Sequence, residues 1–193
     1  MPLLFLFLAL LSPSLVNAGD YKLGERLQPN KSMTTPLAGY TEITWEALTP
    51  KGWDPAASFR EMNLSRLKDS DPRAIEALAK LRKVWDEAPL EQSMNGKRIR
   101  IAGFAVPLER VGDDVSEFLL VPYFGACIHS PPPPANQTIH VLMKGKGRPL
   151  NTMDTVWVAG TLQLHRADSG LGVAGYRIQA DSVRPYSKLI GTR

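Results

Sequence analysis

Cysteine is nearly absent from this chain of 193 residues, which contains a single one, Cys127. One cysteine cannot form a disulfide within the chain, so a fold held together by internal disulfides is excluded. Its thiol must therefore be buried, bound to a metal, joined to a partner or used chemically. No cysteine lies near the N-terminal leader described below, which argues against a lipid-anchored N-terminus.

Long runs of one charge are also missing. Lys and Arg number 23 against 19 Asp and Glu, a net charge of +4, and no basic run is longer than Lys97-Arg98. This balance supplies solubility and does not indicate a nucleic-acid partner. Apolar residues make up 44% of the chain, which is enough material for the core of one domain.

The first 18 residues contain no charged side chain, and residues 3–11 are almost all Leu, Phe and Ala. This apolar run is shorter than the roughly 20 residues that a membrane-spanning helix needs. It is followed by Val16-Asn17-Ala18, a cleavage site of small residues. We therefore predict a signal peptide over residues 1–18, an exported mature chain that begins near Gly19, and no membrane span after cleavage. An uncleaved interfacial anchor is the alternative.

The next two segments differ in composition and in the period of their apolar residues. Residues 19–39 are polar and have no clear period, and they predict a loosely ordered arm. Residues 40–90 predict a helical segment, in which Asp71 is the N-cap and Pro72 the first helical residue. Pro89 ends the helix, and its apolar residues recur at spacings of four, three and four, which predicts a face packed on the rest of the domain. These residues are Ala74, Leu78, Leu81 and Trp85.

Residues 91–186 have the pattern of short strands joined by turns. The spacing, without helices between the strands, predicts a mainly β domain, a small five-stranded antiparallel OB-like barrel on which the helical segment packs. Residues 144–153 are too short and glycine-rich for the helix that OB folds usually place before their fourth strand, so an open, curved sheet is the alternative. Residues 187–193 are read as a tail. The predicted strands are 98–105, 117–124, 137–143, 155–164 and 175–183.

The segment around Cys127 carries the clearest candidate chemistry. Cys127 stands two residues before His129, and in an extended chain residues i and i+2 project to the same side. If the flanking strands form a hairpin, His140 lies opposite this segment. The three side chains then predict a metal site of Cys-His-His type with an open fourth position, as in exchangeable zinc sites. Copper is the alternative metal, with Met143 as a weak thioether ligand.

Plainer readings of the same residues stay open. A lone cysteine at a strand end is often a small buried hydrophobe, and His140 can face outward without a partner. A Cys127 thiolate activated by His140 is a third reading, with Asp113, Asp114 and Glu117 as the nearest candidates for an acid that orients His140. No recognisable nucleophile motif is present, so we favour a non-enzymatic role. His165, at a strand end beside Arg166, is expected to be solvated.

The four prolines at residues 131–134 make this loop stiff, because proline fixes φ and lacks a backbone donor. The loop is either a rigid spacer or, with Asn136 and Gln137, an exposed polyproline surface that docks a partner's aromatic groove. In the second case Cys127 is structural and the protein is an envelope adaptor.

Several motifs together resemble an uncharacterised family of exported bacterial proteins that carries a domain-of-unknown-function label. The resemblance spans most of residues 40–186, and its most specific part is the Tyr123–His129 segment with the prolines and Asn136-Gln137. The other matching segments are Trp45-Glu46-Ala47-Leu48, Asn95-Gly96-Lys97, Gly103-Phe104-Ala105-Val106-Pro107-Leu108-Glu109, Phe118-Leu119-Leu120-Val121-Pro122, Val156-Trp157-Val158-Ala159-Gly160, Gly175-Tyr176 and Val183-Arg184-Pro185-Tyr186.

The resemblance implies an envelope protein whose gene often lies beside genes for an ABC-type transport system, in some bacteria under zinc-responsive control. It has no established catalytic residues to carry over. Our prediction is therefore a periplasmic metal-handling accessory, with zinc bound by Cys127, His129 and His140 and passed to or from an envelope transporter.

Overall fold

The computed structural model describes residues 21–27, 37–54 and 71–186. The predicted signal peptide, most of the arm at residues 19–39 and the predicted tail lie outside these ranges. The described part is mainly β, with a single α-helix and three short 3-10 helices: η3 (Trp45–Leu48), η6 (Gln92–Met94) and η7 (Ala135–Gln137). Within these residues, no helix is both long and apolar enough to cross a membrane.

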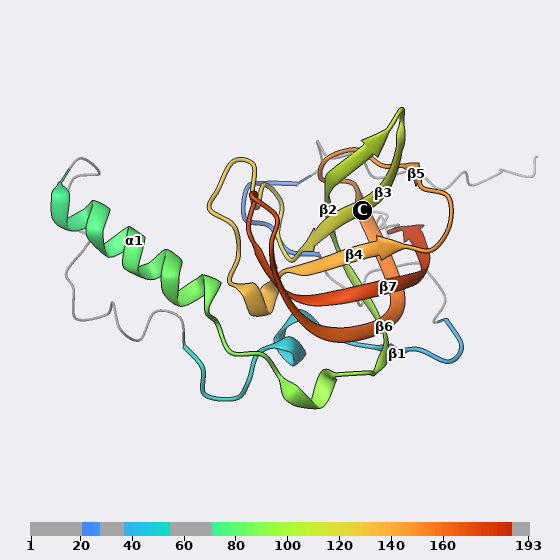
Figure 1. Cartoon of the computed structure of the whole chain (residues 1–193), viewed down its shortest axis with the longest axis horizontal. Coiled ribbons are helices and arrows are strands. Elements are labelled where there is room, and N and C mark those ends of the chain that lie inside the picture. The colour runs from blue at the N-terminus through green and yellow to red at the C-terminus, as the bar shows by residue number, and fades with distance from the viewer. Residues whose placement is uncertain (1–20, 28–36, 55–70, 187–193) are drawn as a thin grey trace, which may run out of the picture.

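Five long strands form the body of the protein, and two strands of two residues each add to its edges (Figure 1). The prediction found the long strands but not the two short ones. The long strands are β2 (Arg98–Val111), β3 (Asp114–Val121), β4 (Ile139–Met143), β6 (Thr155–Asp168) and β7 (Val173–Pro185). The short ones are β1 (Thr41–Glu42) and β5 (Arg148–Pro149).

The seven strands make one mixed sheet, so the expected five-stranded antiparallel arrangement is wrong. The order is β1-β2-β6-β7-β4-β3-β5, and β2 also pairs with β3, so the five long strands pair in a ring. Strand direction cannot alternate all the way around a ring with an odd number of strands, so at least one neighbouring pair must be parallel. That pair is β4–β7, and the edge pair β1–β2 is parallel as well.

Two hydrophobic clusters lie on the two faces of this sheet. The larger cluster is built from alternate residues of the ring, including Phe118, Val141 and Ile178, which are fully buried. The second cluster uses the residues between them, such as Leu119 and Phe104, and is joined by Tyr21 from the N-terminal segment. A strand with one buried face has apolar and polar residues in strict alternation. Long parts of β2 and β3 are buried on both faces, so their apolar residues form continuous runs.

Helix α1 (Pro72–Asp86) begins where the sequence predicted. Asp71 caps it by accepting from the Arg73 backbone N–H at 2.9 Å. The helix projects to one side of the sheet (Figure 1), and Arg166 of β6 binds its C-terminal end by donating to the carbonyls of Asp86 and Ala88. The prediction placed Leu78 on the packed face of the helix, but its side chain is 58% exposed. The buried residue of the helix is Ala77.

Candidate functional site

A cleft of about 610 Å³ lies over the outer side of β3 and β4. One wall comes from the β2–β3 hairpin and the other from the turn between β6 and β7. The volume is in the range of small-molecule sites, roughly 300–1,000 Å³. The apolar residues that line it are Leu108, Leu119, Ala167, Leu171 and Ala174, and the polar ones are Glu109, Glu117, His140, Asp168 and Ser169.

His140 and Glu117 form the floor of the polar half. On adjacent strands, His140 pairs with Leu119 and Glu117 with Leu142, so the two side chains are diagonal neighbours on one face. His140 Nε2 contacts Glu117 Oε1, and the His140 side chain is only 12% exposed. Among the described residues its Nδ1 has no hydrogen-bond partner. A carboxylate that holds one imidazole nitrogen fixes the ring, as the partners of metal-binding histidines do.

Glu109 faces Glu117 directly across the β2–β3 ladder. Like charges in directly opposed positions destabilise a sheet. The ladder also changes register on both sides of Glu109, which marks a β-bulge, and bulges re-aim side chains beside functional sites. The fold therefore holds two carboxylates together at the cleft, and a bound cation would relieve their repulsion.

The β6–β7 turn forms the opposite wall. Asp168 Oδ1 accepts from the Gly170 backbone N–H at 2.8 Å, and Ser169 Oγ donates to the Gly172 carbonyl at 2.8 Å. The β6–β7 ladder also shifts register between Leu164 and Ala167, just before this turn. The turn is therefore ordered by its own hydrogen bonds and carries a third carboxylate to the cleft.

The cleft is acidic in a protein of net positive charge. Within the described part of the chain, no Lys or Arg lines it. Arg177 of β7 pairs with His140 in the β4–β7 ladder. Its guanidinium contacts His165 Nε2. Burial and this guanidinium lower the pKa of His165. His165 thus belongs to a contact on the sheet and is less solvated than the sequence suggested.

Cys127 lies away from this polar group, in the loop after β3. A Cβ built on Gly172 would lie 3.7 Å from Cys127 Sγ and 2.8 Å from Pro132 Cβ, so the thiol sits beside the β6–β7 turn and the proline loop. Cys127 packs against the second hydrophobic cluster, and burial raises the pKa of its thiol to about 11. Its backbone φ is +66°, a left-handed conformation that is uncommon for residues other than glycine.

His129 is exposed in the same loop. The carbonyl of Gly125 accepts from the backbone N–H groups of Ile128, His129 and Ser130 at 3.3, 2.9 and 3.1 Å, so the loop is a tight turn and not the extended strand that the prediction assumed. In a turn, residues i and i+2 need not project to the same side. Across the described ranges, no three His, Cys, Asp or Glu side chains are gathered as a metal-binding group.

The proline loop is part of the packed body. Pro132 and Pro133 are buried, whereas Pro131 is exposed. Asn136 Nδ2 donates to the Pro89 carbonyl at 3.0 Å, and Gln137 Nε2 donates to the Trp45 carbonyl at 2.7 Å. The Asn-Gln motif thus joins η7 to the N-terminal segments, which is a structural role.

Sequence reasoning identified His140, named Glu117 as one of three acids near it, and missed Glu109 and Asp168. The missed residues are far apart in the chain and meet only through strand register and the β6–β7 turn. The available signal was a lone carboxylate, Glu117, beside an apolar stretch of a strand, at a position that a hairpin brings close to His140.

Comparison with known proteins places the chain among uncharacterised ones. The family model described as "Protein of unknown function (DUF3299)" matches residues 45–185. A crystal structure of a DUF3299 family protein from Pseudomonas aeruginosa PAO1 is 36% identical, with a TM-score of 0.60, covering 77% of this chain and 97% of that one.

A putative aspartyl-tRNA synthetase from Leishmania major Friedlin is 10% identical with a TM-score of 0.36, covering 89% of this chain and 24% of that one. That likeness supports no inference about fold or function. No curated protein matches the chain.

Proposed function

This chain belongs to the DUF3299 family of proteins of unknown function, and we propose that it is a non-catalytic cation-binding protein of the cell envelope, with zinc as its ion. The binding site is the acidic cleft, and His140 and Glu117 are its central ligands. The protein works in the periplasm as an accessory to an envelope transporter of the ABC type, as the family resemblance implies.

The ring of five strands supports an OB-like barrel as the scaffold. OB folds bind ligands on the face of their second and third strands, between the first hairpin loop and the loop that joins strands four and five. Around this ring those parts are β3, β4, the β2–β3 hairpin and the β6–β7 turn. They are the elements that line the cleft.

The observation that carries the proposal is the carboxylate-rich surrounding of His140. An imidazole and carboxylates are zinc ligands, and a zinc ion bound between His140 Nε2 and Glu117 Oε1 would replace their direct contact. Glu109, opposite Glu117, can join them by a change of side-chain rotamer. The predicted Cys127 and His129 ligands are the rival site for the ion, and Cys127 would have to lose its proton to bind there.

The adaptor hypothesis has less support from the proline loop. Docking into an aromatic groove needs an exposed polyproline helix, and Pro132 and Pro133 are buried. The half-buried Cys127 thiol, with its raised pKa, gives little support to a thiol enzyme either.

Titration calorimetry with zinc chloride on the metal-free mature chain tests the proposal. We expect one zinc per chain. His140→Ala and Glu117→Gln should each lower the zinc affinity at least about tenfold, because removing even a residue that only orients a metal ligand typically costs about 10–100-fold in affinity. Cys127→Ala is the matched control and should bind as the native chain does. Loss of binding in Cys127→Ala with His140→Ala unchanged would move the site to the loop, and no binding by the folded native chain would overturn the metal function.

A further inference from the structure

The cleft is larger and more apolar than a single metal ion requires. Zinc binds its ligands at about 2.0–2.3 Å, whereas this cleft holds about 610 Å³ and half of its lining residues are aliphatic. Leu108, Ala167 and Leu171 are its accessible aliphatic residues, because Leu119 and Ala174 are buried. Leu171 is 38% exposed, so its side chain is accessible from solvent.

Charge in the cleft selects the sign of a ligand. Glu109, Glu117 and Asp168 are its acidic residues, and no basic residue of the described chain lines it. Glu109 and Glu117 repel each other across the ladder, so a positive group between them gains more than it would at an isolated carboxylate. His140, held by Glu117 and with a buried Nδ1 that lacks a partner among the described residues, adds a further polar group.

We propose that the cleft binds a primary alkylammonium group, with the ammonium between Glu109 and Glu117 and the alkyl chain along Leu108 and Leu171. An ammonium has three donors and no acceptor, which suits a wall of carboxylates. The chain of an alkylamine covers aliphatic surface while its charged end stays among polar groups. This inference rests on the proposed function only in that the cleft is the ligand site.

Two sources supply this chemistry: a free alkylamine and a lysine side chain of a peptide. The cleft has walls on two sides and its rim is open at Leu171, so both can enter. The shared group is the ammonium on a short aliphatic chain, and the probes below separate the sources.

Methyl and amide NMR shifts of the metal-free protein test the inference with three probes of equal length and different charge: hexylamine, hexanol and hexanoate. We expect hexylamine to shift signals of Leu108, Ala167 and Leu171 in a saturable way. Hexanol and hexanoate should bind at least about tenfold more weakly, because only the ammonium brings a positive charge to the carboxylates. Nα-acetyl-lysine-N-methylamide is the arm for a lysine side chain.

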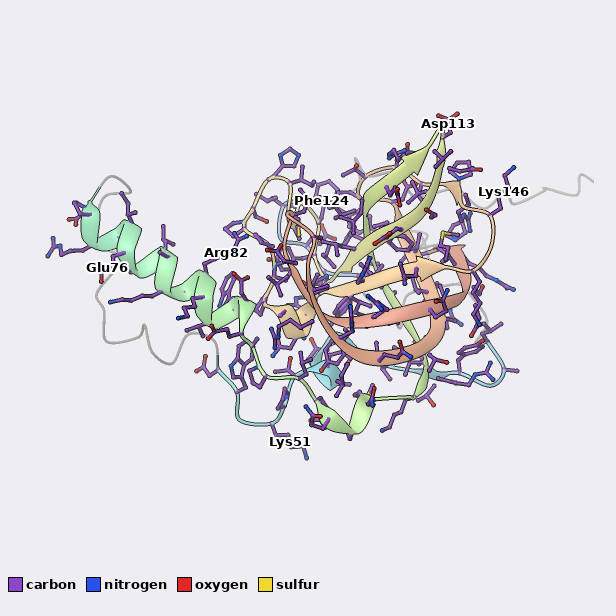
Figure 2. All side chains as sticks on the ribbon, in the orientation of Figure 1. Lys51, Glu76, Arg82, Asp113, Phe124 and Lys146 are labelled. Atoms are coloured by element: carbon purple, nitrogen blue, oxygen red, sulfur yellow. The ribbon has the colours of Figure 1, made fainter. Side chains whose placement is uncertain are left out.

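Glu109→Gln should weaken hexylamine at least about tenfold. Asp113→Asn is the matched control, since Asp113 projects at the tip of the β2–β3 hairpin (Figure 2) and does not line the cleft. Equal binding of all three probes, or an unchanged affinity in Glu109→Gln, would overturn the inference. Zinc binding without amine binding would overturn the inference and leave the proposed function standing. Amine binding without zinc binding would support the inference and refute the metal.

Discussion

Cys127, a predicted zinc ligand, packs against the second hydrophobic cluster. Its thiol lies beside Pro132 and the β6–β7 turn, and its raised pKa of about 11 follows from burial. Because the folded pKa lies above the ordinary 9.0, the protonated thiol stabilises the fold. That contribution is complete below pH 9 and is lost as the pH rises through 11.

Alkylation kinetics check this environment. At pH 8, a thiol of pKa 11 is about one-thousandth thiolate. Iodoacetamide should therefore modify Cys127 at least about tenfold more slowly in the folded chain than in urea, and the difference should shrink as the pH approaches 11. Rapid modification of the folded protein at pH 8 would show that the thiol is exposed or activated.

Glu109 is expected to favour zinc binding and to lower the stability of the metal-free fold. Its charge opposes that of Glu117 in the metal-free protein, so Glu109→Gln should raise the free energy of unfolding by up to about 0.5 kcal/mol. The same variant should bind zinc more weakly. Urea denaturation of both forms, with Asp113→Asn beside them, measures the first effect, and a lower stability for Glu109→Gln would contradict it.

At the scale of elements, short sequence patterns predicted the start of the helix and the long strands. Asp71 and Pro72 marked the start of α1, because a cap and a first-turn proline act within one turn. The five long strands followed from their apolar runs. The parallel pair β4–β7 joins strands from distant parts of the chain, so no local pattern reports it.

The candidate site was predictable to the same degree. His140 was recognisable as a rare residue type, but the placement of Glu109, Glu117 and Asp168 beside it depends on register shifts in the β2–β3 and β6–β7 ladders and on one turn. The turn at Gly125, with three N–H groups on one carbonyl, also removed the extended geometry on which the Cys127–His129 pairing was based.

Gln137 joins two elements and makes a clean test of their connection. Its Nε2 donates to the Trp45 carbonyl at 2.7 Å and to Thr49 Oγ1 at 2.9 Å, and the residue is buried. Gln137→Ala should lower the free energy of unfolding by about 1–3 kcal/mol, the cost of an unsatisfied buried group. Gln163→Ala, at an exposed position on β6, is the matched control and should stay within about 0.5 kcal/mol of the native chain. Equal stability of the two variants would show that η3 is held by other contacts.

At the scale of the whole molecule, the sheet gathers acidic residues in one cleft of a protein with positive net charge. The chain carries a net charge of +4, yet the charged residues of this cleft are acidic apart from a histidine held by a carboxylate. The ring of strands places that cleft on one face, between a bulged hairpin and an ordered turn. A rigid scaffold with a few polar groups converging in a mostly apolar cleft is the usual form of a binding site.

The most direct test of this account is an anomalous difference map from crystals of the mature chain grown with zinc, measured at the zinc absorption edge. The account predicts one peak between His140 Nε2 and the Glu117 carboxylate, absent from crystals of His140→Ala. A peak at Cys127 and His129, or no peak at full zinc saturation, would contradict it.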